Sequence, residues 1–469
     1  MHISTICSFR FSLLLAGSLL ASPFMSGLVN DSLVAQETVD LTIDFVTQKI
    51  TSVDAQVEHD GSVSLVPSDP EQPLTVLPLK VDARFKYFQR PLGENQMVRF
   101  FESAHAKIRL QKGQTEPELA PENRWIIARL KPDNGSRVEI ASIKETLTQA
   151  EYDLLQRPAD SLSLAEFFAR EKVQEGETWS PTDDALSRFL QVDTIIDNQV
   201  QLGLKKLTKK QAQITISGQV SAVVNDVTTE IVLNGLATID HTANAIESLR
   251  LSLKQKRGPG QIDPGFEGQT RVVLKFDGDQ DCDQLSHAAL SRSISQGKIR
   301  QRVKYISPTV GFRLDYDPRW KLIDSKKDLA VLRLIDHGDL LAQCDVMVLP
   351  SRPASQPLTL DKFHSELGHA IESDDTIKLV HKNQSVTKGG LTQLQVVISG
   401  EEEGVPMNWF YYHLSNAEGR QATLVFTLEA SLATRVRAAA AQLLAEFQFT
   451  EPSQAVAGQP REPGKSSSR

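Results

Sequence analysis

The chain has 469 residues, of which 40% are hydrophobic, 23% charged and 6% aromatic, and its formal net charge is −8. Such a length exceeds one ordinary domain, so two or three domains are expected. The mild negative charge argues against nucleic-acid binding, which needs a concentrated basic face.

The N-terminal segment, residues 1–36, has the features of a secretory signal peptide. Arg10 precedes a short apolar run, Phe11–Ala21. This run is shorter than the roughly 20 apolar residues that cross a bilayer. A charged start, a short apolar core and small residues after it predict export, with cleavage near Ala35 or after Ala21. An uncleaved membrane anchor is the alternative. No later run is long enough to span, so the mature chain is expected to lack a transmembrane segment and to be secreted or periplasmic.

Residues 37–280 are predicted to form a β-rich domain. Apolar and polar residues alternate with the period of a half-buried strand in Val39–Phe45, Leu79–Tyr87 and Ala104–Leu110. Between 192 and 276, consecutive strands with short turns, one of them at Asn225-Asp226, predict an antiparallel meander. The strands expected there are Gln211–Val220, Thr228–Ile239, Ile246–Lys254 and Thr270–Phe276.

Two helices are expected to cover the apolar face of this sheet, because a half-buried sheet must pack against another layer. Ser163 and Glu166 have the spacing of a capping box. The run Ser180-Pro181-Thr182-Asp183-Asp184 offers a capping hydroxyl, a proline and two acids, and indicates a second helix start that continues through Phe189. Residues 192–276 also resemble secreted bacterial curved-sheet domains related to lipoprotein carriers.

The segments on either side of the C-terminal part are expected to be solvated. Residues 281–304 are predicted to be a linker, and the tail 452–469, rich in Pro, Gly and Ser, to be disordered. Cys282 and Cys344 either form a disulfide in an oxidising compartment or remain separate thiols, with Cys344 buried in a strand. The sequence leaves both possibilities open.

Residues 305–451 are predicted to form a second domain with a definite order of elements. Strands are expected at 312–316, 330–334, 344–349, 378–383, 391–399, 407–414 and 422–428. The helix 359–372 places Leu360, Phe363 and Leu367 on one face. Hairpin turns are expected at 389–390 and 416–419. A final helix, Ala433–Phe447, closes the domain.

Several motifs in this domain resemble the PsbP family. They are Gly311-Phe312 with the Pro318–Trp320 corner, the glycine hairpin before Leu391, the strand Trp409–His413, and the closing Leu443–Phe449. The superfamily, which also includes a Ran-binding nuclear import factor, has an α/β/α sandwich fold. The resemblance therefore implies a sandwich with an antiparallel sheet and a role in binding or supporting assemblies. It carries over no individual functional residue.

A run of alternating aspartates is the first candidate metal site, but its pattern does not match a known calcium-binding loop. Asp277, Asp279, Asp281 and Asp283 alternate, but an EF-hand needs glycine at its sixth position and glutamate at its twelfth, where this run has Cys282 and Ala288. A solvated acidic linker is the preferred interpretation.

His364, Glu366 and His369 lie on the predicted helix 359–372. The histidines are five residues apart, whereas a helical zinc site needs four. The glycine-rich segments 258–260 and 265–268 lack phosphate-binding patterns and are interpreted as turns. We assign no catalytic, cofactor-binding or metal-binding residue from the sequence.

The expected fold class is α+β, with an antiparallel β-rich domain followed by the PsbP-like domain. The expected function is that of an exported, non-catalytic binding or scaffold protein whose partner is another envelope or secreted protein. A carrier of a lipid or small hydrophobic ligand in the curved β domain is one alternative, and an uncharacterised hydrolase is another. The partner's identity and the oligomeric state are left open.

Overall fold

The computed structural model describes residues 38–43, 49–67, 72–93, 95–130, 137–260, 263–296, 299–307, 309–325, 329–336, 338–371 and 377–451. The expected signal segment, 1–36, and the expected tail, 452–469, lie outside the described residues. The described residues from Thr38 onward form one compact unit. The domain boundaries proposed from the sequence therefore stay predictions.

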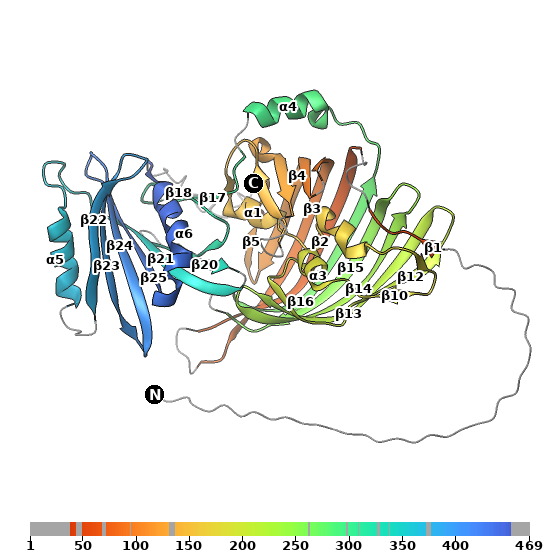
Figure 1. The fold of residues 1–469 in the computed structure, drawn as a ribbon, viewed down its shortest axis with the longest axis horizontal. Helices are drawn as coiled ribbons and strands as arrows, with labels where there is room; N and C mark the ends of the chain where they lie inside the picture. Colours follow the sequence, from red (N-terminus) through yellow and green to blue (C-terminus); the bar gives the residue numbers. More distant parts are fainter. Residues whose placement is uncertain are drawn as a thin grey trace, which may run out of the picture. The chain divides into compact units, whose positions relative to one another are not determined.

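Among the described residues, thirteen antiparallel strands form the larger sheet (Figure 1). In spatial order its main path is β10 (Thr178–Trp179), β12 (Gln201–Leu207), β13 (Gln211–Val224), β14 (Val227–Asp240), β15 (Ala245–Arg257), β16 (Gly265–Asp277), β2 (Thr51–Leu65), β3 (Thr75–Gly93), β4 (Gln96–Leu110), β6 (Trp125–Arg129) and β7 (Glu139–Ser142). Two further strands lie off this path: β11 (Thr194–Asn198) pairs with β13, and β5 (Gly113–Thr115) pairs with β4.

The expected meander is confirmed, and alternation explains it. In β13 the residues Ala212, Ile214 and Ile216 are buried while their neighbours are more exposed. Asn225 and Asp226 connect β13 to β14 with φ angles of 48° and 69°, the left-handed conformation of a tight hairpin turn. The pairing of β16 with β2, more than 200 residues apart in sequence, joins the meander to the N-terminal strands.

The first expected strand is shorter than its pattern suggested. β1 (Thr38–Val39) pairs with β9 (Val173–Gln174) in a separate two-stranded sheet, and residues 40–43 are not in a strand. Residues 44 and 45 of the expected strand lie outside the described part of the chain.

Three short helices pack against the larger sheet, as a half-buried sheet requires. They are α1 (Gln149–Leu155), α2 (Leu164–Phe168) and α3 (Asp183–Leu190). Figure 1 shows α1 and α3 lying against the strands. Phe167 and Phe189 stack with ring centroids 3.8 Å apart. Both belong to the same apolar core as Ile214 and Leu233 of the sheet.

The expected helix caps lie at other residues. Ser163 is in the right-handed helical conformation and accepts no cap bond, because a 3₁₀ turn, Ser161–Ser163, already precedes α2. A capping box is formed instead by Thr148 and Glu151 at the start of α1. At α3 the capping hydroxyl belongs to Thr182, which accepts from the Ala185 N–H at 3.2 Å.

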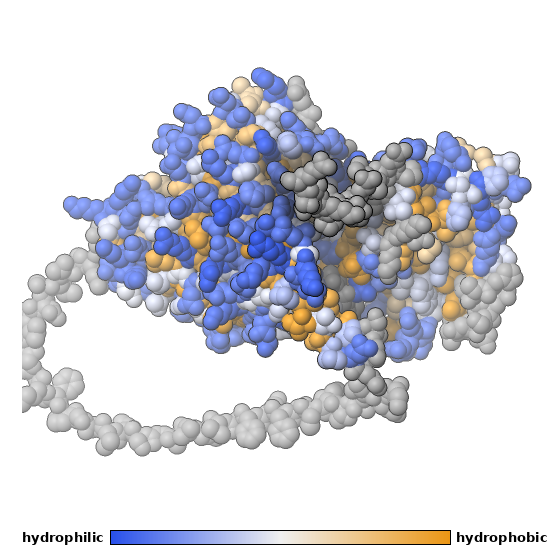
Figure 2. Space-filling view, turned by 180° about the vertical axis from the view of Figure 1, so that it is seen from behind, coloured by the Kyte–Doolittle hydropathy of each residue, from blue (hydrophilic) through white to orange (hydrophobic). Residues whose placement is uncertain are grey.

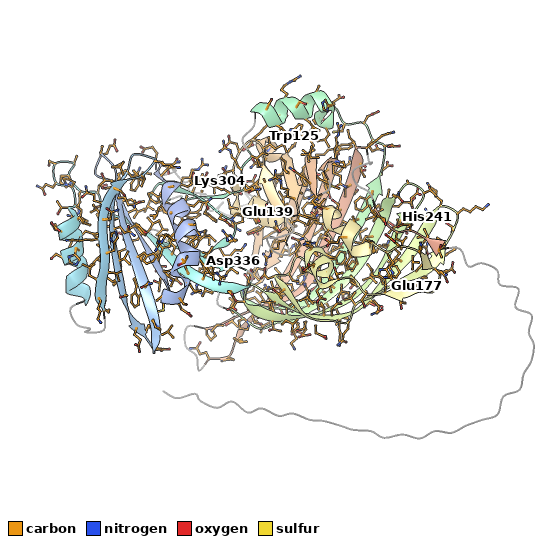
Figure 3. All side chains as sticks on the ribbon, viewed as in Figure 1. Trp125, Glu139, Glu177, His241, Lys304 and Asp336 are labelled. Carbon is orange, nitrogen blue, oxygen red and sulfur yellow. The ribbon has the colours of Figure 1, made fainter. Side chains whose placement is uncertain are left out.

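The segment 281–304, expected to be a solvated linker, is partly packed onto the larger sheet. It contains a 3₁₀ turn, Asp283–Leu285, and the helix α4 (His287–Gln296). Leu285 and Leu290 are buried together with Trp125, which lies beneath α4 in Figure 3. Cys282 belongs to this cluster, whereas Cys344 is buried in another, and both are free thiols.

In the described C-terminal part, seven antiparallel strands form a second sheet. Its spatial order is β19 (Trp320–Ser325), β20 (Leu329–Asp336), β21 (Asp339–Leu349), β25 (Gln421–Glu429), β24 (Val405–Ser415), β23 (Thr392–Glu402) and β22 (Lys378–Val386). A four-stranded sheet contains β26 (Phe447–Phe449), β18 (Phe312–Tyr316), β17 (Val303–Ile306) and β8 (Leu147–Thr148). Phe447, expected in the last helix, is therefore in a strand, although it is buried as expected.

The seven-stranded sheet has a helix on each face (Figure 1). Phe363 of α5 (Leu360–Ile371) packs with Leu394, Val396 and Ile398 on one face. The helix α6 (Ala433–Ala445) lies on the other face, where its buried residues join the core formed by β20, β21 and β25. The described chain is thus β-rich, antiparallel and sparing in helices, which agrees with the α+β class.

Candidate functional site

A groove lies between α6 and the end of the seven-stranded sheet, and we call it the helix–sheet groove. Its volume is about 610 Å³. The lining residues are Val380, His381, Thr387, Lys388, Gln393, Gln395, Val397, Asn408, Phe410, Tyr412, Ala433, Arg437, Ala440, Ala441, Leu444 and Ala445. The lining combines apolar and polar side chains in about equal number, and a groove of this size has the general form of a ligand-binding site.

Strand register explains why these side chains share a face. His381 pairs with Val397, which pairs with Phe410. Because alternate residues of a strand point to opposite faces, this row lies opposite the residues of β23 that pack under α5. Gln395 and Tyr412 form the next pair on the groove face, so the floor is part aromatic and part polar.

The α6 wall of the groove consists mainly of alanines, together with Arg437 and Leu444. Ala433, Ala440 and Ala441 line it, at spacings that place them toward one side of a helix. Small residues keep the helix from filling the space above Phe410 and Tyr412. The helix thus encloses the groove without closing it.

The polar groups of the groove include two cations, Lys388 and Arg437, and several amide and hydroxyl groups that can both donate and accept. The Gln395 side-chain amide donates to the Tyr412 hydroxyl at 2.9 Å. Among the described residues no acceptor is found for the hydroxyl proton of Tyr412. Burial raises the pKa of Tyr412 to about 12, so the hydroxyl keeps that proton at neutral pH. Lys388 and Arg437 add positive charge, and the lining contains no Asp or Glu.

A second polar cluster is fully buried and holds the α1–α2 connection against the larger sheet. Arg99 of β4 donates to both carboxylate oxygens of Asp160, at 2.8 and 2.5 Å. Arg99 also donates to Ser161, which donates to Gln89 at 2.6 Å. The two charged side chains are only 2% and 3% exposed. Apart from the Arg99 Nε, which has no hydrogen-bond partner among the described residues, these groups bond to one another, and we interpret the cluster as a structural clamp.

His59 occupies a special place on the larger sheet. Its ring stacks on Phe266 with centroids 4.5 Å apart, and its Nδ1 lies 3.1 Å from the Thr270 hydroxyl. A Cβ at Gly268 would lie 2.6 Å from His59 Cε1, and one at Gly61 would lie 2.8 Å from His59 Nε2. The interpretation of Gly265–Gly268 as a turn is therefore wrong, because these residues lie in β16 and Gly268 gives the ring its space.

The alternating aspartates at 277–283 and the histidines of α5 do not come together to form a metal site among the described residues. Asp277 ends β16, Asp279 pairs with exposed Lys49 at 3.4 Å, and Asp283 begins a 3₁₀ turn. His364 lies on α5, and the side chain of His369 lies outside the described residues. Within the described ranges, no three or more His, Cys, Asp or Glu side chains are arranged to hold a metal ion.

The described part of the chain contains no helix that is both long and apolar enough to cross a membrane. Figure 2 shows that apolar side chains reach the surface in separate patches among hydrophilic ones. Burial raises the pKa of both the Cys282 and Cys344 thiols, which makes them poor nucleophiles.

No family model matches this chain, and no curated protein matches it. The structure is similar to the solution structure of cyanobacterial PsbP from Synechocystis sp. PCC 6803, with 14% identity over 36% of this chain and 98% of that one, at a TM-score of 0.26. A crystal structure from Bacteroides thetaiotaomicron shares 16% identity over 32% of this chain, at a TM-score of 0.23. This chain spans 48% of the length of that protein.

The immunity protein TplEi of the type VI secretion system of Pseudomonas aeruginosa is a third similar structure. It shares 7% identity over 51% of this chain and 98% of its own, at a TM-score of 0.21. All of these likenesses are weak. The expected PsbP resemblance is supported only at this coarse level.

The sequence analysis missed the helix–sheet groove. Its strands and its helix were each predicted, but Arg437 and Tyr412 are 25 residues apart and only the packing of α6 on β24 brings them to one groove. The alanines of α6 could have indicated the groove, because their small side chains leave space beside a helix that buries Val436 and Leu443.

Proposed function

We propose that this chain is an exported, non-catalytic binding protein that docks a protein partner through the helix–sheet groove. The observation that carries the proposal is the groove itself, with an aromatic floor, several donors and no carboxylate in its lining. Nucleophilic catalysis by a hydroxyl or thiol needs an activating group, such as a base, next to the nucleophile. The described lining contains neither Ser nor Cys, and no hydrogen bond among its described residues pairs His381 with a hydroxyl there.

A PsbP-like sandwich, the finer fold assignment, is part of this proposal. Helices on both faces of the antiparallel sheet support it. The carrier alternative has less support, because the apolar face of the larger sheet packs against Phe167 and Phe189 of the chain's own helices. The hydrolase alternative stays a prediction, and a screen with fluorogenic esters, phosphates and glycosides tests it.

The test is a crosslinked pull-down from the native envelope fraction with two matched variants of the full chain. Ala441→Trp places a large ring in the groove, whereas Ala438→Trp adds the same ring at an exposed position of α6 outside the lining. We expect a partner that wild type and Ala438→Trp recover and Ala441→Trp loses. Equal recovery by both variants, or no specific recovery at all, contradicts the proposal.

A further inference from the structure

The outer edge of β22 is the boundary of the seven-stranded sheet. Among the described residues no strand pairs with that edge. Residues 378–384 are all exposed, and Val380 and Val386 reach 60% and 70% exposure. An open edge presents backbone donors and acceptors that another strand can pair with. Since Val380 and His381 also line the helix–sheet groove, the groove reaches this edge.

The groove beside this edge is lined by positive side chains and by no carboxylate. Lys378 lies at the start of β22 and Lys388 lines the groove, whereas Lys382 is paired with Asp361 of α5 at 2.9 Å. The chain as a whole has a net charge of −8. Arg437 adds a further positive group from the helix wall. A segment that binds here is therefore selected for negative charge.

Hydrogen-bond chemistry points the same way. The Tyr412 hydroxyl oxygen accepts from Gln395 at 2.9 Å, which leaves the hydroxyl able to donate to a bound segment. A carboxylate satisfies such a donor better than another donor group does. The chain's own tail does not fit, because residues 452–469 carry Arg461, Lys465 and Arg469 against the single acid Glu462.

We propose that an extended acidic segment of a partner protein adds as a strand to the outer edge of β22, with apolar side chains entering the helix–sheet groove. This inference rests on the proposed function and specifies its partner. Backbone pairing supplies the affinity of such strand addition, and the pockets for alternate side chains supply the specificity. The lysines select the acidic residues of the segment.

The test uses the full chain and an acetylated, amidated peptide in which glutamate alternates with valine and phenylalanine. Two control peptides replace each glutamate by lysine or carry N-methyl groups along one backbone edge. Binding is measured by fluorescence anisotropy, and amide hydrogen exchange is followed across Lys378–Val386. We expect the acidic peptide alone to bind and to slow exchange in this segment.

Charge variants separate local from general attraction. Lys378→Glu combined with Lys388→Glu is expected to weaken binding by about tenfold, because two favourable exposed charge contacts become repulsive. Lys205→Glu combined with Lys209→Glu makes the same change of net charge on exposed residues of β12 and of the turn after it, and should leave binding unchanged.

Two outcomes overturn the inference. If the N-methylated peptide binds equally well and exchange in Lys378–Val386 is unchanged, strand addition is wrong, although groove docking survives. If no peptide binds, the acidic-strand partner is wrong, and the pull-down with Ala441→Trp and Ala438→Trp decides the proposed function separately.

Discussion

Replacing Asp160 by alanine should destabilise the chain more than any single surface charge change. Asp160 is the counter-ion of Arg99, and the side chains are 3% and 2% exposed. Burial disfavours the ionised carboxyl, but Arg99 outweighs this and lowers the pKa of Asp160. In Asp160→Ala the guanidinium stays buried without its partner, which costs about 3–5 kcal/mol of unfolding free energy.

A double replacement makes the prediction sharper. When Arg99→Met is added to Asp160→Ala, the uncompensated buried charge is gone. Two costs remain. The Leu162 N–H loses its acceptor, the Asp160 carboxylate 3.0 Å away, and the smaller side chain leaves a cavity. We expect the double variant to lose only about 2 kcal/mol, less than the single variant.

The assay is urea unfolding followed by circular dichroism, with free energies from linear extrapolation. Asp82→Ala is the control, since Asp82 pairs with Arg84 at 3.3 Å while both side chains are about half exposed. That loss should be at most about 1 kcal/mol. Equal losses of unfolding free energy for Asp160→Ala and Asp82→Ala would refute the buried-clamp argument. A double variant less stable than Asp160→Ala alone would also refute it.

The same pair predicts a pH dependence. A carboxyl whose folded pKa is lowered contributes stability above its ordinary pKa of 3.8 and loses it as pH falls through the folded pKa. The difference in unfolding free energy between wild type and Asp160→Ala should therefore be full at pH 7 and shrink below pH 3.8. A difference that stays constant in acid would contradict the assigned role of the ionised carboxyl.

Three further changes test individual features. Thr182→Ala should cost about 1 kcal/mol, whereas Ser180→Ala should cost only a few tenths, because Thr182 caps α3; urea midpoints compare them. Gly268→Ala should cost about 1–3 kcal/mol in the same assay because its Cβ meets His59, and Gly93→Ala, with open space, should be nearly neutral. Burial lowers the pKa of His59, so melting temperature should fall as pH drops below 6.5 and fall less in His59→Phe; equal slopes would exclude this contribution.

Local patterns were enough for most elements. Strands β13 to β16 follow from alternation, and the Asn225-Asp226 turn follows from residues that tolerate positive φ. The start of α3 was placed within a few residues, although the choice between Ser180 and Thr182 as cap was not. That choice depends on which hydroxyl reaches the Ala185 N–H. Ser180 and Thr182 both carry a hydroxyl near the helix start, so the sequence alone does not distinguish them.

The candidate site lay beyond the sequence because its parts come from distant segments. The alternation in β22–β24 indicates two faces but not which face a helix leaves open. Only the packing of α6 beside Tyr412 and of Phe363 on the opposite face decides that. Likewise, Arg99 and Asp160 are 61 residues apart, and no local pattern joins them.

The sequence by itself determined the antiparallel β-rich class, the order of the C-terminal elements and the absence of a recognisable catalytic motif, since these depend on short-range periodicity and spacing. Tertiary structure alone decided the pairing of β16 with β2, the buried clamp at Asp160 and the helix–sheet groove. The physical reason is that burial and strand pairing are long-range: a side chain's surroundings depend on segments that meet only when the chain folds.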